Sequence, residues 1–238
     1  FLELINAYLL KAECQFETDD VIGLKTTVKV ELKTLRELLL VFSSKTVEVE
    51  PLQKLMKIVG CLCSIGKYMN HLDMMNEAFV FIGEAVNLSR AVNKKYGLFS
   101  TNWLHYTALR IDGDQHIKFN VENHLKQAET AYEEAYDVAV DLYEQSKTSE
   151  TQLGVAESIL NICRAKNKLG KQDEVIEKLK SALELYGELS KKVHTLLLRH
   201  RTYKAYYSAA EIYVDMKESQ RALEIIDRGL SINEEILR

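Results

Sequence analysis

Apolar residues recur along this 238-residue chain at the three- and four-residue spacing of amphipathic helices. Residues that interrupt helices are scarce, since the chain contains one proline, Pro51, and ten glycines. Folds rich in strands need many more turn residues than this. The pattern therefore predicts an all-α protein built from long helices.

Breaks in the pattern divide the chain into ten expected helices. Pro51 suits the first turn of a helix, where a missing N–H costs nothing. The step from Gly170 to Lys171 is typical of a helix C-cap followed by a tight turn. The Asp-Gly-Asp stretch at 112–114 is the clearest predicted loop. We expect helices at 1–16, 20–43, 51–72, 74–94, 98–111, 116–147, 150–169, 172–194, 196–216 and 218–237.

Internal repetition is the strongest signal in the sequence. Four blocks share a small residue, a large apolar residue four positions later and a small residue seven positions after the first. They begin at Ala78, Ala128, Val175 and Ala222, at intervals of 50, 47 and 47 residues. Small side chains at i and i+7 let a neighbouring helix approach to about 8–10 Å, while the bulky residue fills the space between. Because such hairpins cannot bury their apolar faces alone, they stack in arrays.

This pattern resembles tetratricopeptide repeats, whose second helix carries the same small, large, small positions. The matching segments are 59–88, 156–185 and 203–232. The resemblance implies an α-solenoid of about five stacked antiparallel hairpins forming one domain over residues 1–238. Residues 1–50 would be a degenerate first hairpin and residues 51–238 four clearer repeats. The intervals exceed the family's usual length of about 34 residues, and its proline after the second helix is missing, so a divergent relative with longer helices is expected.

In the family that the chain resembles, the first helix of each hairpin lines the inner, concave face and presents polar side chains to a partner. Asn161, Arg164 and Lys168 follow the spacing i, i+3, i+7 and therefore form one stripe. Such a stripe suits carboxylates of a partner, and it partly resembles the family's carboxylate clamp. The resemblance implies eleven partner-binding residues: Lys67, Asn70, His71, Asn161, Arg164, Asn167, Lys168, Lys204, Tyr207, Ser208 and Glu211.

The resemblance implies a non-enzymatic scaffold or adaptor that binds a segment of a partner protein in a concave groove. Two alternatives stay open: a peptide-sensing module of a transcriptional or signalling regulator, and the non-catalytic helical region of a large enzyme or assembly subunit. Assembly into a homo-oligomer also stays open. Phe1 lies inside an apolar helical pattern with no cap before it, which indicates a fragment of a longer protein.

Charge and hydropathy exclude several classes of partner. A net charge of −4 and a pI near 5.9 give no general attraction to nucleic acid or to anionic membranes. No apolar run reaches the roughly 20 residues needed to span a bilayer. We therefore expect an intracellular protein, cytoplasmic or nuclear, that binds neither membrane nor nucleic acid. The basic run from Lys191 to Lys204 is interpreted as a solvated helix face, with an anion-binding patch as the alternative.

Catalytic and metal-binding patterns are missing from the sequence. It contains no nucleophile constellation and no glycine-rich phosphate loop, and we expect no enzyme activity, no cofactor and no metal. The histidines at 105, 116 and 124 straddle the predicted loop without the i, i+4 spacing of a helical metal site, and are expected to be surface or capping residues.

Three further sets of residues have structural interpretations. The cysteines are expected to be small buried hydrophobes in a reducing compartment. Most tyrosines are expected to lie in the core, and the acidic series on the predicted helix 116–147 to be mostly solvated. The cysteines are Cys14, Cys61, Cys63 and Cys163, and the acidic series is Glu129, Glu133, Glu134, Asp137, Asp141 and Glu144.

Overall fold

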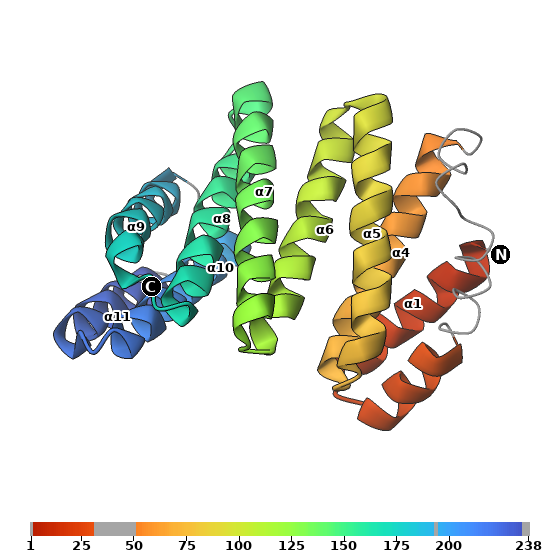
Figure 1. Cartoon of the computed structure of the whole chain (residues 1–238), viewed down its shortest axis with the longest axis horizontal. Helices are drawn as coiled ribbons and strands as arrows, with labels where there is room; N and C mark the ends of the chain where they lie inside the picture. Colours follow the sequence, from red (N-terminus) through yellow and green to blue (C-terminus); the bar gives the residue numbers. More distant parts are fainter. Residues whose placement is uncertain (1, 31–50, 193–194, 235–238) are drawn as a thin grey trace. The chain divides into compact units, whose positions relative to one another are not determined.

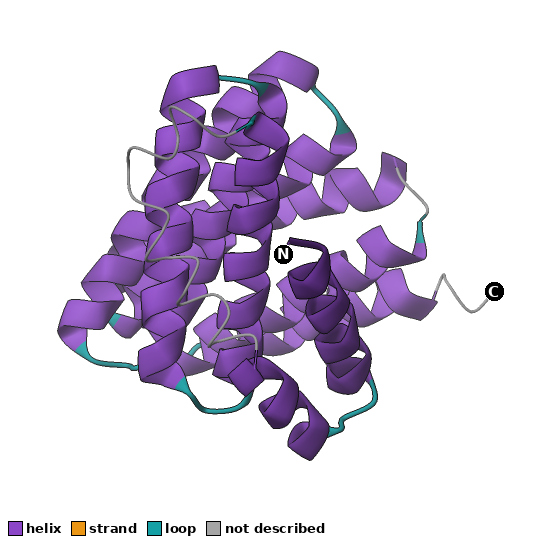
Figure 2. Ribbon diagram, turned by 90° about the vertical axis from the view of Figure 1, so that its right-hand side faces the viewer, coloured by secondary structure: helices purple, strands orange, loops and turns teal. Residues whose placement is uncertain are grey.

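The computed structural model describes residues 2–30, 51–192 and 195–234, and all regular secondary structure in these ranges is helical (Figures 1 and 2). The chain divides into two compact units, Phe1–Gln115 and His116–Arg238. The predicted all-α class is confirmed, and the helices follow one another as antiparallel hairpins, about five in number. One continuous repeat domain stays a prediction, and most of the helix predicted at 20–43 lies outside the described residues.

Unit 1 contains the hairpin formed by α4 (Leu52–His71) and α5 (Met75–Tyr96). Pro51 directly precedes α4 in an extended conformation, and Asp73 adopts a positive φ of 58° in the turn between the two helices. Gly97, with a φ of 57°, ends α5 in the left-handed conformation that glycine adopts without strain. The helices of this unit are α1 (Leu2–Glu17), residues 21–30, α4 (Leu52–His71), α5 (Met75–Tyr96) and most of α6 (Phe99–Lys118).

Unit 2 contains the remaining helices, and their ends agree with the predicted ends to within a few residues, except that α7 begins at Glu122 and not at 116. Gly170 follows the end of α8 (Ser149–Lys168) with a φ of 74°, as expected for a C-cap glycine. The junction near residue 195 is capped by Thr195, whose hydroxyl accepts a hydrogen bond of 3.3 Å from the backbone N–H of Leu198. The elements are α7 (Glu122–Ser146), α8 (Ser149–Lys168), the short 3-10 helix η1 (Gln172–Glu174), α9 (Val175–Lys192), α10 (Leu196–Asp215) and α11 (Ser219–Glu234).

The repeated small, large, small positions lie where hairpin helices touch. In α5 the triplet of Ala78, Ile82 and Ala85 is fully buried. Ile82 packs directly on Gly66 of α4, so closely that a Cβ at Gly66 would lie 2.3 Å from Cγ1 of Ile82. A Cβ at Gly229 would lie 2.9 Å from Cβ of Tyr206 in the hairpin of α10 and α11. The predicted close approach of paired helices is therefore confirmed.

The predicted loop at 112–114 is wrong, because α6 runs through it without interruption. Arg110 and Asp114 form an i, i+4 ion pair of 3.8 Å across this stretch. Gly113 is buried within this helix. A glycine there destabilises the helix by about 1 kcal/mol relative to alanine, but its position is packed and not exposed to solvent. The turn comes later, at residues 119–121, where Asn120 has a φ of 48°.

Glu129 is also not the solvated residue that was expected. Its carboxylate lies 2.7 Å from Nζ of Lys171 and 3.5 Å from Nζ of Lys166, and both Glu129 and Lys166 are buried. Lys166 also pairs with Glu174 of η1 and lies 3.9 Å from Glu133. The buried Lys166 near the end of α8 needs a carboxylate nearby, and Glu129 of α7 supplies one from the side that packs on α8.

Three of the four cysteines are buried as expected, and all four are free thiols. Burial raises the pKa of Cys63 and of Cys163 to about 12, so neither thiol supplies a thiolate at neutral pH. Cys14 is the exception, because it is exposed. It lies two residues from the fully buried Ala12, and therefore about 200° away from it around α1.

Candidate functional site

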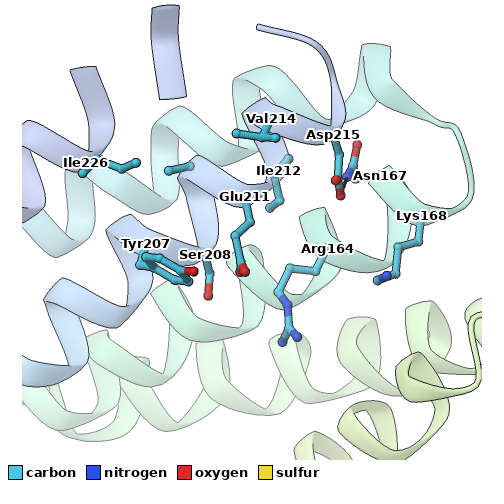
Figure 3. A pocket seen from close by; sticks show the side chains of 11 residues that line it. Arg164, Asn167, Lys168, Tyr207, Ser208, Glu211, Ile212, Val214, Asp215 and Ile226 are labelled. Atoms are coloured by element: carbon cyan, nitrogen blue, oxygen red, sulfur yellow. Dashed lines mark hydrogen bonds between the residues drawn. The ribbon is translucent and has the colours of Figure 1, made fainter. Parts of the chain in front are cut away.

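A groove of about 620 Å³ lies along α8 and α10 in unit 2 (Figure 3). Six of the eleven residues predicted to bind a partner line it. They are Arg164, Asn167 and Lys168 of α8, and Tyr207, Ser208 and Glu211 of α10. The two helices meet at these positions because the repeat interval of 47 residues brings equivalent turns of successive hairpins side by side.

Asn167 is the most constrained polar residue in the groove. Its side chain is only 7% exposed, and its Nδ2 donates a hydrogen bond of 3.0 Å to Oδ2 of Asp215 (Figure 3). The other amide atom, Oδ1, is buried and has no hydrogen-bond partner among the described residues. A buried acceptor without a partner costs about 1–3 kcal/mol. The amide of Asn167 therefore links α8 to α10 through Asp215, and its Oδ1 is shielded from the groove.

Charged side chains stand on both sides of this amide. On α8, the guanidinium of Arg164 donates to Oδ1 of Asn161 at 3.2 Å, and Nζ of Lys168 lies 3.5 Å from Oδ1 of Asn120. The acceptor of Lys168 is a neutral amide, so this bond orients the ammonium without cancelling its charge. On α10, the carboxylates of Glu211 and Asp215 belong to exposed residues.

Apolar side chains complete the groove. Tyr207 and Val214 of α10 are 51% and 56% exposed. Ile226 of α11 is partly buried beside them, and Ile212 is buried. An apolar side chain of a ligand would bury surface against this group. Each Å² of apolar surface removed from water contributes about 25 cal/mol to the free energy of binding.

The other two predicted residues of unit 2 lie beside the groove. Asn161 contacts it only through its hydrogen bond with Arg164. Lys204 is exposed on α10, one turn before Tyr207, and is not part of the lining.

Two of the three predicted residues of unit 1, Lys67 and His71, contact Phe16 of α1 in the chain itself. Nζ of Lys67 lies 5.2 Å from the ring centroid of Phe16, and the His71 ring meets the same ring edge-on at 4.7 Å. Asn70 lies three residues before Asp73, just as Asn167 lies three residues before Gly170. Its Oδ1 is likewise buried without a partner among the described residues. The two asparagines are thus equivalent positions, one in each unit.

Sequence reasoning missed Asp215, Val214 and Ile226 as groove residues. The repeat interval contained the signal for Asp215, which follows Lys168 by 47 residues. The apolar pair gave no signal, because an exposed apolar residue in a helix has the same sequence pattern as a core residue.

The histidines differ from the surface residues that were expected. Nδ1 of His116 lies 2.9 Å from Nδ1 of His124, and His105 is buried with a bond of 2.9 Å to Ser89. Burial lowers the pKa of His116 to about 4, with a smaller contribution from His124. Within the described ranges, no group of three or more potential ligands is suited to a metal ion. None of the described helices combines the length and the apolar character that crossing a bilayer requires.

Comparison by sequence finds no relative, since neither a known family model nor a curated protein matches the chain. Comparison by structure finds several. BtubC (BKLC) from P. vanneervenii is similar over 99% of this chain and 82% of its own, with a TM-score of 0.63 and 14% identity. A putative kinesin light chain from Podosopora anserina with nearly identical TPR-like repeats is similar over 100% of this chain and 99% of its own, with a TM-score of 0.54 and 13% identity.

A Rap protein in complex with competence and sporulation factor is also similar, with a TM-score of 0.63 and 18% identity. The alignment covers 96% of this chain but 53% of the Rap chain, so this chain spans about half the length of that protein. At these identities the likeness concerns the fold alone. The chain therefore has a tetratricopeptide-repeat-like fold, as the sequence predicted.

Proposed function

We propose that the chain is a non-enzymatic scaffold or adaptor that binds a segment of a partner protein in the groove between α8 and α10. The observation that carries this proposal is the groove of about 620 Å³, whose lining combines exposed apolar side chains with charged ones. The exposed Tyr207 and Val214 would contribute apolar contact, which supplies most of the affinity in typical interfaces.

Other features support a binding role over a catalytic one. The charged side chains of the groove are two cations and two carboxylates, and Ser208 makes no hydrogen bond to a base among the described residues. Folds of this repeat type present surfaces rather than reaction centres. A protein partner in an intracellular compartment, cytoplasmic or nuclear, agrees with the free thiols and with the acidic net charge.

A second candidate function is a regulatory module that senses a short peptide. The likeness to the Rap protein complexed with competence and sporulation factor favours it. The two candidates differ in what binding does to the chain. A sensor changes conformation when the peptide binds, whereas an adaptor keeps its shape. Small-angle scattering of the chain with and without its ligand separates them.

The proposal is tested by affinity capture from the native lysate with the full chain and with a variant carrying Asn161→Ala, Arg164→Ala and Lys168→Ala. We expect the wild type to retain a partner and the variant to lose at least nine-tenths of it, because both cations of the α8 stripe are removed. The matched control carries Glu177→Ala, Lys180→Ala and Glu184→Ala, three exposed residues of α9 with the same spacing.

Circular dichroism melting verifies that both variants remain folded. Retention of the same proteins by the wild type, the groove variant and the control would contradict the assignment of binding to this groove. Loss in the control alone would place the binding surface on α9.

A further inference from the structure

In unit 2, the hairpin of α8 and α9 has a side that receives the next hairpin, and α10 covers it. The hydroxyl of Tyr206 in α10 donates a hydrogen bond of 3.4 Å to the backbone oxygen of Leu183 in α9. Nε of Arg201 in α10 lies 3.1 Å from the carboxylate of Glu157 in α8. Leu183 and Leu160 belong to the same buried cluster as Tyr206 and are only 4% and 6% exposed. The structure therefore shows how one repeat covers the side of the repeat before it.

The equivalent side of α10 and α11 is apolar but exposed. In three pairs of positions that lie 47 residues apart, the earlier side chain is at most 7% exposed and the later one is at least 43% exposed. The pairs are Leu160 and Tyr207, Asn167 and Val214, and Leu183 and Leu230. Leu223 is 57% exposed and lies seven residues before Leu230, on the same side of α11. We define the receiving face as Tyr207, Val214, Leu223, Ile226 and Leu230.

The receiving face is continuous across the two helices. Val214 and Ile226 line the same groove (Figure 3). Leu223 lies three residues before Ile226 and Leu230 four residues after it, so all three lie on one side of α11. Exposed apolar patches mark interaction sites, and repeats at the end of an array have polar outer faces. Because a helix, α10, covers the equivalent side one repeat earlier, the apolar receiving face indicates a helix that packs on it.

Charges along α10 indicate the polarity of that helix. Lys204 lies in the first half of α10, and Glu211 and Asp215 lie in the second half, all three on its exposed side. Among the described residues, the side chains of Lys204 and Glu211 have no hydrogen bond or ion pair, and Asp215 bonds only to the neutral amide of Asn167. The helices α8 and α10 are parallel, since each is antiparallel to α9. A helix that packs on α10 in the same way would therefore place its first half beside Lys204.

The charges of α11 make the receiving face more acidic. Asp227 lies beside the apolar stripe of this helix, four residues after Leu223. The two arginines of α11 have partners within the chain. Arg221 lies 2.6 Å from the carboxylate of Glu218, and Arg228 lies over the ring of Tyr206. A matching helix therefore needs basic residues, except beside Lys204.

A second copy of this chain does not supply the matching helix through α1. The second half of α1 exposes two acids, Glu13 and Glu17, beside one cation, Lys11. In a parallel arrangement, these acids would lie beside Glu211 and Asp215. Like charges that meet in an interface oppose association, so the charge pattern favours a different protein.

We propose that the receiving face binds an amphipathic helix of a partner protein, with acidic residues in its first half, basic residues in its second half and an apolar stripe along both. The helix packs on α10 and α11 as α10 packs on α8 and α9. Apolar contact supplies affinity, and the charges set the direction of the helix. This goes beyond the proposed function, since it adds a surface on α11 and the chemistry of the helix that binds there.

Two designed 20-residue peptides, each held helical by a hydrocarbon staple, test the proposal. Both carry leucines at every third or fourth position. The first peptide has glutamates in its first half and lysines in its second half, and the other peptide has the reverse order. In fluorescence anisotropy with the full chain, we expect the first peptide to bind about tenfold more tightly. The variant Lys204→Glu, Glu211→Lys should reverse this preference.

The double variant Leu223→Asp, Leu230→Asp tests the location of the site. We expect it to weaken binding of the first peptide about tenfold, because two apolar contacts are replaced by charges that would be desolvated. The matched control Leu10→Asp, Ile22→Asp makes the same kind of change at two exposed apolar residues of unit 1 and should not alter binding. Circular dichroism verifies that all variants are folded. None of them changes the α8 residues that test the groove, so the two proposals can fail separately.

Equal affinity of the two peptides, or binding that persists in the α11 double variant, would overturn the proposal. Self-association of the wild type in sedimentation equilibrium, abolished by the α11 double variant, would show that a second copy occupies the face instead. Failure of both peptides to bind would also overturn the proposal. A lower melting temperature of the α11 double variant would then show that the chain itself covers the face.

Discussion

Lys166→Met is expected to lower the free energy of unfolding by about 3 kcal/mol. The ammonium of Lys166 lies 3.5 Å from the carboxylate of Glu129, and their side chains are only 8% and 11% exposed. Methionine keeps the length of the chain but leaves Glu129 in a nearly water-free site with one cation, Lys171, instead of two. Urea denaturation followed by circular dichroism measures the loss.

Lys126→Met is the matched control for this substitution. Lys126 pairs with Glu122 at 2.7 Å, but the two side chains are 60% and 74% exposed. An exposed i, i+4 pair contributes about 0.3–0.5 kcal/mol, so the control should change stability by less than about 1 kcal/mol. Equal effects of the two substitutions would contradict the account of a buried ion cluster holding α8 against α7.

Gly66→Ala is expected to destabilise the chain by about 2 kcal/mol. The added Cβ would lie 2.3 Å from Cγ1 and 2.8 Å from Cδ1 of Ile82, which is fully buried. Ile82 is the large residue of its repeat triplet, and its surroundings leave it little room to turn away. The helices α4 and α5 must therefore separate, which weakens the packing along the hairpin. Thermal unfolding by calorimetry measures the effect.

Gly83→Ala makes the same chemical change in α5, at the residue directly after Ile82. A Cβ at Gly83 meets nothing within 4 Å. Alanine is a better helix former than glycine by about 0.5–1 kcal/mol, so this variant should be neutral or more stable than the wild type. Stabilisation by both substitutions would show that α4 and α5 do not approach as closely as described.

The fold was predictable because its signals are local. The triplet at Ala78, Ile82 and Ala85 depends on helical spacing alone, and its repetition revealed the stack before any contact was known. The error at 112–114 came from reading Gly113 as a breaker. Whether a glycine ends a helix depends on what packs against it, and that information lies in other helices.

The candidate site was predictable in part. The α8 stripe of Arg164 and Lys168 followed from helical spacing, and the family resemblance added Tyr207 and Glu211 of α10. The burial of Asn167 was not predictable, because it depends on how α8 and α10 pack against each other. The buried charge of Glu129 was missed for the same reason, since its partners are on another helix.

Hydrogen–deuterium exchange of the chain, with and without its captured partner, tests the central claim most directly. If the groove holds the partner, exchange should slow in α8 around Asn167 and in α10 between Tyr207 and Asp215, since ordering of these turns suppresses local opening. The exchange rate of α9 should not change. Protection confined to α9, or to unit 1, would contradict the account and move the binding surface away from the groove.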